Sequence, residues 1–194
     1  MSVRPLVHVG DPVLRVPTRP VTTEELPSAD IQALIADLID TMRDANGAGI
    51  AAPQIGVSLR IAIAEVTPEH TATRYPYKPP IPPTVLVNPV LTPLEEGTET
   101  INEWCLSVPG LRGELQRHVA VQVQWLDREG VAHDEMKRGV TAGTFQHECD
   151  HLDGMVFVDR VSDPTTFMTW ANYQRFHREA FEERIGAYVQ RVGS

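Results

Sequence analysis

Residues 146–151 read Q-H-E-C-D-H, and the pattern H-E-x-x-H within them constrains this chain more than any other stretch. Residues four apart share one face of an α-helix, so His147 and His151 can present two imidazoles to one cation. Glu148 lies one step around that face, where it can contact a water on the metal without being a ligand itself. The competing interpretation is a surface helix on which both histidines and the glutamate are solvated. A metal site on a helix is the leading hypothesis.

Two helices can be placed from their end signals. The helix with the two histidines is expected to contain residues 142–152, with Thr141 as its N-cap and Gly154 ending it in a left-handed conformation. An earlier helix follows Ser28, a good N-cap, and its apolar positions recur with helical spacing. Those positions are Ile31, Leu34, Ile35, Leu38, Ile39 and Met42. This stripe is expected to face the core.

Composition places the chain among ordinary globular proteins. It has 194 residues, of which 42% are hydrophobic and 22% charged, and this length suits a single catalytic domain over residues 1–194. The net charge of -9 argues against binding to DNA or to an anionic membrane. Two cysteines do not make a disulfide framework, and we find neither a signal-peptide pattern nor an apolar run of transmembrane length. We expect a cytoplasmic protein, with a monomer as the default.

The remaining segments predict an α+β fold. Four stretches are expected as strands. Residues 59–66 alternate, residues 84–94 form a strand or a strand pair interrupted by Asn88-Pro89, and residues 119–126 and 131–137 form a hairpin. They are expected to flank the buried H-E-x-x-H helix. A proline-rich insertion over about residues 67–83 is expected at the surface, and a C-terminal helix over about residues 164–190 completes the chain.

Residues 47–56, with the sequence G-A-G-I-A-A-P-Q-I-G, make a poor helix and a poor strand. They suit a loop whose backbone comes close to another group. Gln54 is the one side chain of this loop with both a hydrogen-bond donor and an acceptor. The alternative for Gln54 is an exposed position in a tight connection.

Two imidazoles leave a catalytic metal site incomplete, because such a site usually takes three protein ligands and keeps one position open. Four downstream residues are formal candidates for the third ligand: His177, Glu179, Glu182 and Glu183. Cys149 is excluded, since it points to the opposite side of the helix from the histidines. The better candidate is Cys105, which can bind as a thiolate. A lone cysteine is otherwise a small buried apolar residue in most proteins.

Three stretches in this order resemble the signature motifs of the peptide deformylases: G-A-G-I-A-A-P-Q at 47–54, E-W-C-L-S at 103–107 and Q-H-E-C-D-H-L at 146–152. The resemblance runs across nearly the whole chain. It implies a compact α+β fold with mixed antiparallel sheets around the H-E-x-x-H helix. It also implies a metal-dependent hydrolase that removes the formyl group from the N-terminal formyl-methionine of nascent peptides and releases formate.

The resemblance assigns the metal to Cys105, His147 and His151, with a water molecule in the fourth position. The family typically uses Fe²⁺, and Zn²⁺, Ni²⁺ or Co²⁺ can occupy the same site. Thiolate and imidazole donors suit Fe²⁺ and Zn²⁺ alike, so the sequence does not choose among the ions.

The resemblance also implies the residues of catalysis and substrate binding. Glu148 takes the role of general acid and base. The side-chain amide of Gln54 and the backbone N–H of Leu106 bind the oxyanion that develops on the formyl group. The backbone at Gly49 and Ile50 lines the peptide groove.

One position departs from the family, because Trp104 replaces the glycine that is usual in E-G-C-L-S. A tryptophan there can crowd the pocket or add an aromatic wall to the groove. The second hypothesis is an H-E-x-x-H metallopeptidase with a downstream ligand. The third, which Trp104 alone supports, is an inactive paralogue that binds peptide N-termini. Transient ribosome association is left open, because the nearly neutral segment 164–194 gives little electrostatic reason for tight RNA binding.

Three charged residues near the motifs have two interpretations each. Arg112 and Arg117 either anchor Glu103, Asp150 or a substrate carboxylate, or are solvated at the surface. Asp150 either orients a metal ligand or forms a surface ion pair. The sequence does not decide between these roles.

Overall fold

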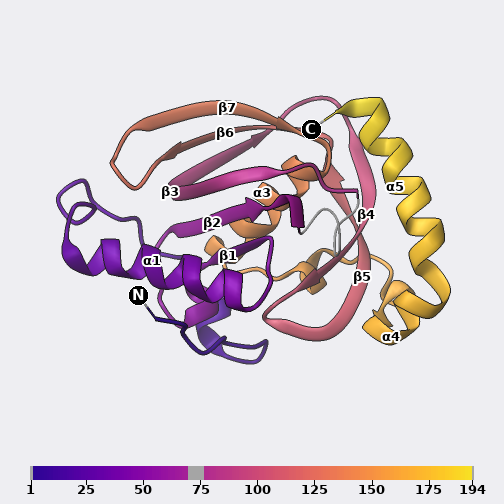
Figure 1. Cartoon of the computed structure of the whole chain (residues 1–194), viewed down its shortest axis with the longest axis horizontal. Coiled ribbons are helices and arrows are strands. Elements are labelled where there is room, and N and C mark those ends of the chain that lie inside the picture. The colour runs from indigo at the N-terminus through magenta and orange to yellow at the C-terminus, as the bar shows by residue number, and fades with distance from the viewer. Residues whose placement is uncertain (1, 70–76, 194) are drawn as a thin grey trace.

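The computed structural model describes residues 2–69 and 77–193, which form two antiparallel sheets and the helices that cover them (Figure 1). The larger sheet has the order β1-β2-β3-β6-β7, with strands β1 Gly49–Ala51, β2 Ile61–Val66, β3 Ile81–Pro93, β6 Ala120–Leu126 and β7 Ala132–Arg138. The smaller sheet has the order β4-β5-β8, with strands β4 Thr98–Cys105, β5 Val108–His118 and β8 Met168–Thr169. The predicted α+β arrangement is confirmed.

Two helices pack on opposite faces of the larger sheet: α1 Ala29–Asp44 and α3 Gly139–Leu152. Successive residues of a strand point to opposite faces, and β2 follows this rule. Ile61 and Ile63 pack with the apolar stripe of α1, whereas Ala62 and Ala64 belong to the cluster around α3. Small side chains on the α3 face let this helix lie close to the sheet, so α3 occupies the centre of the molecule.

The N-terminus of α3 differs from the sequence prediction. The helix begins at Gly139 with Arg138 as its N-cap, so the predicted N-cap Thr141 lies inside the first turn. Gly139 has φ +56°, and a Cβ atom there would lie 2.3 Å from the carbonyl oxygen of Gly193. A glycine therefore lets the chain turn into the helix directly from β7, next to the end of the C-terminal helix.

The C-terminus of α3 ends as the sequence predicts. Gly154 has φ +78°, and its N–H donates to the carbonyl of His151 at 3.3 Å. The N–H of Met155 donates to the carbonyl of Asp150 at 2.9 Å, which completes a Schellman motif. A Cβ atom on Gly154 would lie 2.9 Å from the backbone of Arg15, so the close approach of this segment also requires glycine.

Residues 47–56 are more regular than the expected loop. Gly49–Ala51 form the edge strand β1, which pairs with β2 through Gly49 and Ala64. The 3-10 helix η2 follows over Ala52–Ile55. Small residues override their weak strand propensity here because Ala51 is completely buried and its backbone pairs with β2.

The proline-rich insertion expected at about 67–83 lies partly outside the described residues, which omit 70–76. Its last part already belongs to β3, which begins at Ile81 rather than at residue 84. The register with β2 is irregular at this end, where prolines are tolerated in a strand. Farther along β3, Asn88 has φ +52° and the pairing with β6 shifts between Val87 and Val90, as the Asn-Pro interruption suggests.

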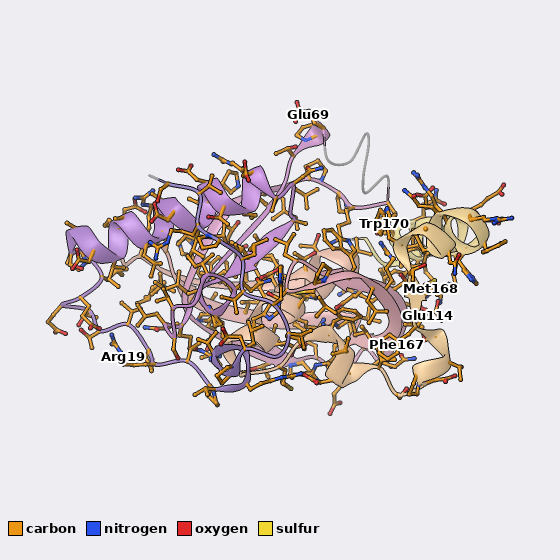
Figure 2. All side chains as sticks on the ribbon, turned by 90° about the horizontal axis from the view of Figure 1, so that it is seen from below. Arg19, Glu69, Glu114, Phe167, Met168 and Trp170 are labelled. Atoms are coloured by element: carbon orange, nitrogen blue, oxygen red, sulfur yellow. The ribbon has the colours of Figure 1, made fainter. Side chains whose placement is uncertain are left out.

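The C-terminal region, expected as one helix over about 164–190, is divided. It contains the 3-10 turn η4 Pro164–Thr166, strand β8, the short α4 Trp170–Asn172, the π-helical turn η5 Tyr173–His177 and helix α5 Arg178–Val192. Asp163 does cap, but it caps only η4. Met168 pairs with Arg112 of β5, and α4 begins two residues later at Trp170 (Figure 2). Because Met168 and Thr169 pair with β5, the long C-terminal helix begins only at Arg178.

Helix α5 packs against the first turn of α3. Phe181, Ile185 and Tyr188 form an apolar cluster with Val119 and Val140. The C-terminal helix thus closes one side of the centre of the molecule, next to β4 and β5 (Figure 1). Within residues 2–69 and 77–193, none of the helices has the length and apolar character needed to cross a lipid bilayer.

Candidate metal centre

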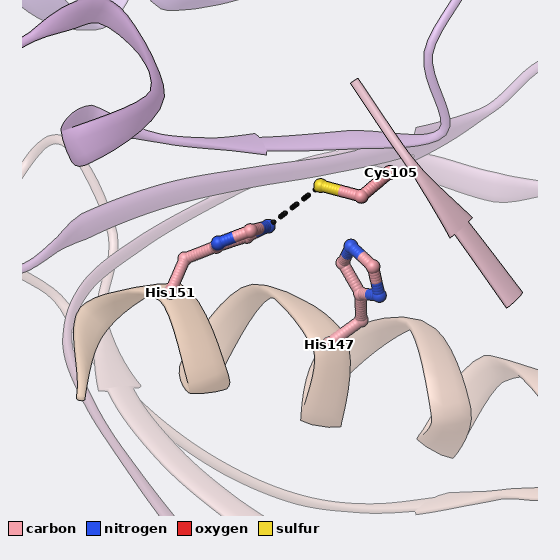
Figure 3. Close-up of side chains that lie close together, drawn as sticks. All are labelled: Cys105, His147 and His151. Carbon is pink, nitrogen blue, oxygen red and sulfur yellow. Dashed lines mark hydrogen bonds between the residues drawn. The ribbon is translucent and has the colours of Figure 1, made fainter. Parts of the chain in front are cut away.

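Three side chains from two elements meet at the centre of the fold (Figure 3). Cys105 is the last residue of β4, while His147 and His151 extend from adjacent turns of α3. Their ligand atoms all lie within 4.8 Å of one another, and Cys105 Sγ is 3.2 Å from His151 Nε2. Cys105 and His151 are buried, with 3% and 1% of their surfaces exposed. The thiol and the two imidazoles are thus close enough to share one ion.

The chemistry of this donor set fits a single divalent metal ion. Nitrogen and sulfur donors form the usual ligand shell of such ions in tetrahedral sites. Burial lowers the pKa of His151 well below its ordinary value, which keeps this imidazole neutral and able to donate a lone pair. The downstream candidates His177, Glu179, Glu182 and Glu183 do not join this cluster in the part of the chain that is described.

Glu103 orients His147 from the opposite strand. His147 Nδ1 is 2.8 Å from Glu103 Oε2, so the carboxylate holds the ring with its other nitrogen available to an ion. Burial alone would raise the pKa of Glu103, but the charges of Arg117 and His147 hold it well below the usual range. Burial would likewise lower the pKa of His147, but Glu103 and Cys105 raise it well above its ordinary value, so an ion that binds its other nitrogen would displace a proton.

A buried ion network supports Glu103 in turn. Arg117 donates to both oxygens of Glu103 at 2.7 and 2.9 Å and to Asp150 Oδ2 at 2.6 Å. Arg160 completes the chain with two hydrogen bonds to Asp150, at 2.7 and 2.5 Å. Arg117 therefore anchors Glu103 and is not solvated at the surface, which decides between the two interpretations of the sequence. Asp150 does not contact a metal ligand through its side chain but acts through Arg117 and Glu103.

Gln54 faces the cluster from η2. Its Oε1 accepts a hydrogen bond from the Ala51 N–H at 2.8 Å, which fixes the orientation of the amide. Its Nε2 donates to Ser107 Oγ at 3.1 Å and lies 3.5 Å from Cys105 Sγ. Gln54 is 2% exposed, so the exposed alternative is wrong, and its amide N–H groups point toward the metal ligands.

Glu148 lies against the backbone of β1. A Cβ atom on Gly49 would be 2.1 Å from Glu148 Oε1, so only glycine leaves room for this carboxylate. The close approach expected of the glycine-rich stretch is therefore an approach to Glu148. Burial raises the pKa of Glu148 to about 7, and its Oε2 has no hydrogen-bond partner among the described residues. Such a carboxyl group can both accept and return a proton near neutral pH.

The cluster opens into a pocket with about 690 Å³ of empty space, part of it open to solvent. Six of the predicted site residues line it: Gly49, Gln54, Cys105, Leu106, His147 and Glu148. The side chain of Ile50 is instead buried in the cluster under α1. His151 is buried and does not line the pocket.

Trp104 and Arg112 take defined places beside the pocket. Trp104 lines the pocket and packs edge-on against Trp170, with ring centroids 6.0 Å apart. Arg112 is 2% exposed and donates to the side chain and carbonyl of Asn102 at 2.5 and 3.1 Å. Its guanidinium lies 3.9 Å from the ring centre of Tyr173. Trp104 therefore forms an aromatic wall shared with the C-terminal segment, and Arg112 is not a solvated residue.

Sequence reasoning missed two parts of the site. Glu103 was not identified as the partner of His147, although it precedes Cys105 by two residues in a strand and so shares its face. That spacing is a signal that could have found it. Lys78 and Thr144 also line the pocket, and no motif marks them. Lys78 comes from the proline-rich stretch, whose position cannot be inferred from local pattern.

Known proteins resemble the chain over most of its length. A family model described as polypeptide deformylase matches residues 3–167. A peptide deformylase of Leptospira biflexa is 41% identical over 86% of this chain and 92% of its own length, and peptide deformylase 1 of Nitrosomonas europaea is 44% identical over 85% and 91%. The class I type b peptide deformylase from Acinetobacter baumannii, in a crystal structure with bound Met-Ala-Ser, superposes with a TM-score of 0.78 and 36% identity, covering 82% of this chain and 99% of that one.

Proposed function

The chain belongs to the peptide deformylase family, and we propose that Cys105, His147 and His151 hold the catalytic metal ion of this enzyme. Members of this family are metal-dependent hydrolases, and this chain removes the formyl group from the N-terminal formyl-methionine of newly made polypeptides. One observation supports the site above all others. A thiol and two imidazoles converge at a pocket that Glu148 and Gln54 also line.

When bound, the ion would act as a Lewis acid and would lower the pKa of a water molecule to roughly 7, which would make that water a nucleophile at neutral pH. We propose Fe²⁺ as the native ion, with Zn²⁺, Ni²⁺ or Co²⁺ able to occupy the same site. One thiolate and two imidazoles suit ions of this group. The fixed ring of His147 and the neutral ring of His151 support the binding of a divalent ion at this site.

Glu148 is proposed to move the proton in both halves of the reaction. It accepts a proton from the attacking water, whose oxygen bonds to the formyl carbon. It then donates that proton to the amide nitrogen as the C–N bond breaks, which yields formate and a free α-amine. The raised pKa of Glu148, caused by burial, suits both steps near neutral pH.

Two donors are proposed to stabilise the negative charge that grows on the formyl oxygen. The first is Gln54 Nε2, whose orientation is fixed by the Ala51 N–H. The second is the backbone N–H of Leu106, the residue after the ligand Cys105. Loss of one such donor lowers the rate by about 10²–10³-fold in comparable sites.

The peptide is proposed to lie along the pocket beside the backbone of Gly49 and Ile50. The relative from Acinetobacter baumannii binds Met-Ala-Ser, the kind of peptide that deformylation produces. We further propose that residues 1–194 act as one catalytic domain, a cytoplasmic monomer that contacts the ribosome only transiently. The net charge of -9 supports the absence of DNA and membrane binding.

Formate release from formyl-Met-Ala-Ser tests this function. Protein loaded anaerobically with Fe²⁺ should release one formate for each free amine formed. Glu148→Ala, loaded in the same way, should retain the ion and lose turnover. Metal-loaded wild-type protein that binds the peptide but releases no formate would contradict the proposal.

A further inference from the structure

A lysine lines the pocket that holds the reaction centre. Lys78 Nζ donates a hydrogen bond to Thr144 Oγ1 at 2.8 Å, and the hydroxyl of Thr144 also contacts the Val140 carbonyl at 3.2 Å. Thr144 precedes Glu148 by one helical turn of α3, which corresponds to about 5.4 Å along the axis. The ammonium group is therefore held on α3 beside the turn that carries the catalytic groups.

The pocket extends from the metal ligands along α3 toward this lysine. Beside His147 and Glu148, its wall includes Gly143 and Val140 of α3 and Ile101 of β4, and Phe181 and Ile185 of α5 also line the pocket. Gly143 has no side chain to fill the space, and a Cβ atom there would lie 3.1 Å from Ile101 Cδ1. This passage is narrow and apolar, so it fits an unbranched side chain better than a branched one.

The covalent structure of a formyl peptide places its first side chain in the passage. A formyl group at the metal ligands is bonded to the amide nitrogen, and the side chain of the formylated residue begins two bonds farther on. An unbranched side chain of methionine length spans about one helical turn, which brings its end near Thr144 and Lys78. The end of that side chain would therefore meet a cation rather than an apolar surface.

The ammonium group can act as a hydrogen-bond donor at neutral pH. Burial lowers the pKa of Lys78 to about 8, so the group stays mostly protonated at pH 7. The carboxylates of Glu103 and Glu148 oppose this shift, and Arg112 reinforces it. A buried cation that hydrogen-bonds a ligand favours acceptors strongly over apolar atoms of the same shape.

We propose that Lys78 is a specificity-determining residue that donates a hydrogen bond to an acceptor at the end of the first side chain of the substrate. The inference rests on the proposed deformylase function and names the substrate class of that site. The favoured class is formyl peptides whose first side chain is unbranched and ends in an acceptor. The thioether of methionine is a weak acceptor, and the oxygen of methionine sulfoxide is a strong one.

The test compares formyl peptides that differ only in the first side chain. Metal-loaded full-length enzyme is given formyl-X-Ala-Ser, where X is methionine sulfoxide, methionine or norleucine, which has a methylene in place of sulfur. We expect kcat/KM for the sulfoxide peptide to exceed that for the norleucine peptide by about tenfold, the effect of one charge-assisted hydrogen bond. The difference should lie mainly in KM, because the contact is remote from the reacting bond.

Lys78→Met should bring this ratio to about one or below. Lys137→Met is the matched control, because Lys137 lies on β7, pairs with Glu135 at 2.6 Å and does not line the pocket. It should keep the wild-type ratio. If Lys78→Met shows no cooperative thermal transition, Lys78→Gln replaces it and should lower the ratio, because its neutral amide donates a weaker hydrogen bond than an ammonium group.

Two results would overturn the inference. One is a wild-type ratio of one or less, and the other is a folded Lys78 variant that keeps the wild-type ratio. Absence of formate release from all three peptides by metal-loaded wild-type enzyme would instead contradict the proposed function itself, and the inference with it.

Discussion

Helix α3 and the β4–β5 hairpin both build the metal centre, but they do so by different physical means. On α3, helical spacing alone places His147 and His151 on one face. The hairpin provides Cys105 from the end of β4 and, two residues earlier, Glu103, which orients His147. The helix therefore determines which groups can meet, and the hairpin determines the direction in which one of them points.

The two elements also differ in how they manage buried charge. The hairpin carries Glu103 and Arg117, and α3 carries Asp150, which Arg160 pairs from beyond the helix. These charges alternate in sign along the network, so each buried ion has an opposite neighbour. Buried pairs contribute little net stability but are costly to break. The network thus serves to hold the site in one arrangement, and the helix motif depends on it.

The largest expected effect is on metal binding, and it should differ between variants of the two buried cysteines. Cys105→Ala should lose metal and activity together, because it removes the ligand that the hairpin provides. Cys149→Ala is the matched control: burial raises the pKa of Cys149 to about 12, and this thiol lies outside the ligand cluster. Elemental analysis after gel filtration measures the bound ion. If Cys105→Ala retained stoichiometric metal, the hairpin would not provide a ligand, and one of the downstream candidates would have to be the third ligand.

Glu148→Gln should have the next largest effect. It should lower the reaction rate without changing the metal ligands. Its kcat should fall by about 10²–10⁴-fold, the usual contribution of a general acid–base, with the metal content unchanged. Steady-state formate release and metal analysis of the same preparation measure both quantities. A variant that loses its metal as well would show that Glu148 supports the ligands rather than the proton transfer.

Glu103→Gln should weaken the hairpin side by a smaller amount. The variant leaves Arg117 less well paired and His147 less firmly oriented, so metal affinity should fall by about 10–100-fold. Glu99→Gln on the same strand is the control, because its pair with the exposed Arg191 contributes little. Competition with a chelator gives both affinities. Equal affinities for the two variants would show that the hairpin does not orient the ligand.

The smallest effect concerns the stability of the metal-free protein at different pH values. Burial raises the pKa of Glu148 from 4.5 to about 7 in the folded state. As the pH rises between these values, the unfolded chain releases a proton that the folded chain keeps, so stability falls and the full loss is reached above pH 7. Glu148→Gln should therefore raise Tm by roughly several degrees at pH 8 and by little at pH 5. Calorimetry with a chelator present measures both shifts, and equal shifts would contradict this explanation.

Much of the fold can be predicted from the sequence, because helices and strands each have their own spacing of apolar residues. The apolar stripe of α1 and the strand patterns of β2 and β6 are visible in the sequence, and the turn after β6 indicates β7. Strands β4 and β5 were not predicted. They carry Glu103, Arg112 and Arg117 at buried positions, so their polar residues do not alternate with apolar ones as in a half-buried strand. Their burial depends on partners that are distant in the chain.

The site divides in the same way. The ligands Cys105, His147 and His151 follow from the motifs and from the resemblance they carry, and the structure brings them together. The supporting network and Lys78 could not be predicted, because each depends on a contact between segments that are far apart. Arg117 and Asp150 are 33 residues apart, and Lys78 and Thr144 are 66 apart. Sequence motifs therefore identify the reacting groups better than the groups that hold them.

X-ray absorption spectroscopy of the zinc-loaded protein tests the central claim most directly, namely that α3 and the hairpin share one ion. The structure predicts one sulfur neighbour at about 2.3 Å and nitrogen or oxygen neighbours at about 2.0–2.1 Å, with the sulfur signal lost in Cys105→Ala. A spectrum of the wild-type protein with no sulfur neighbour would contradict the account, since the helix would then bind the ion without the hairpin.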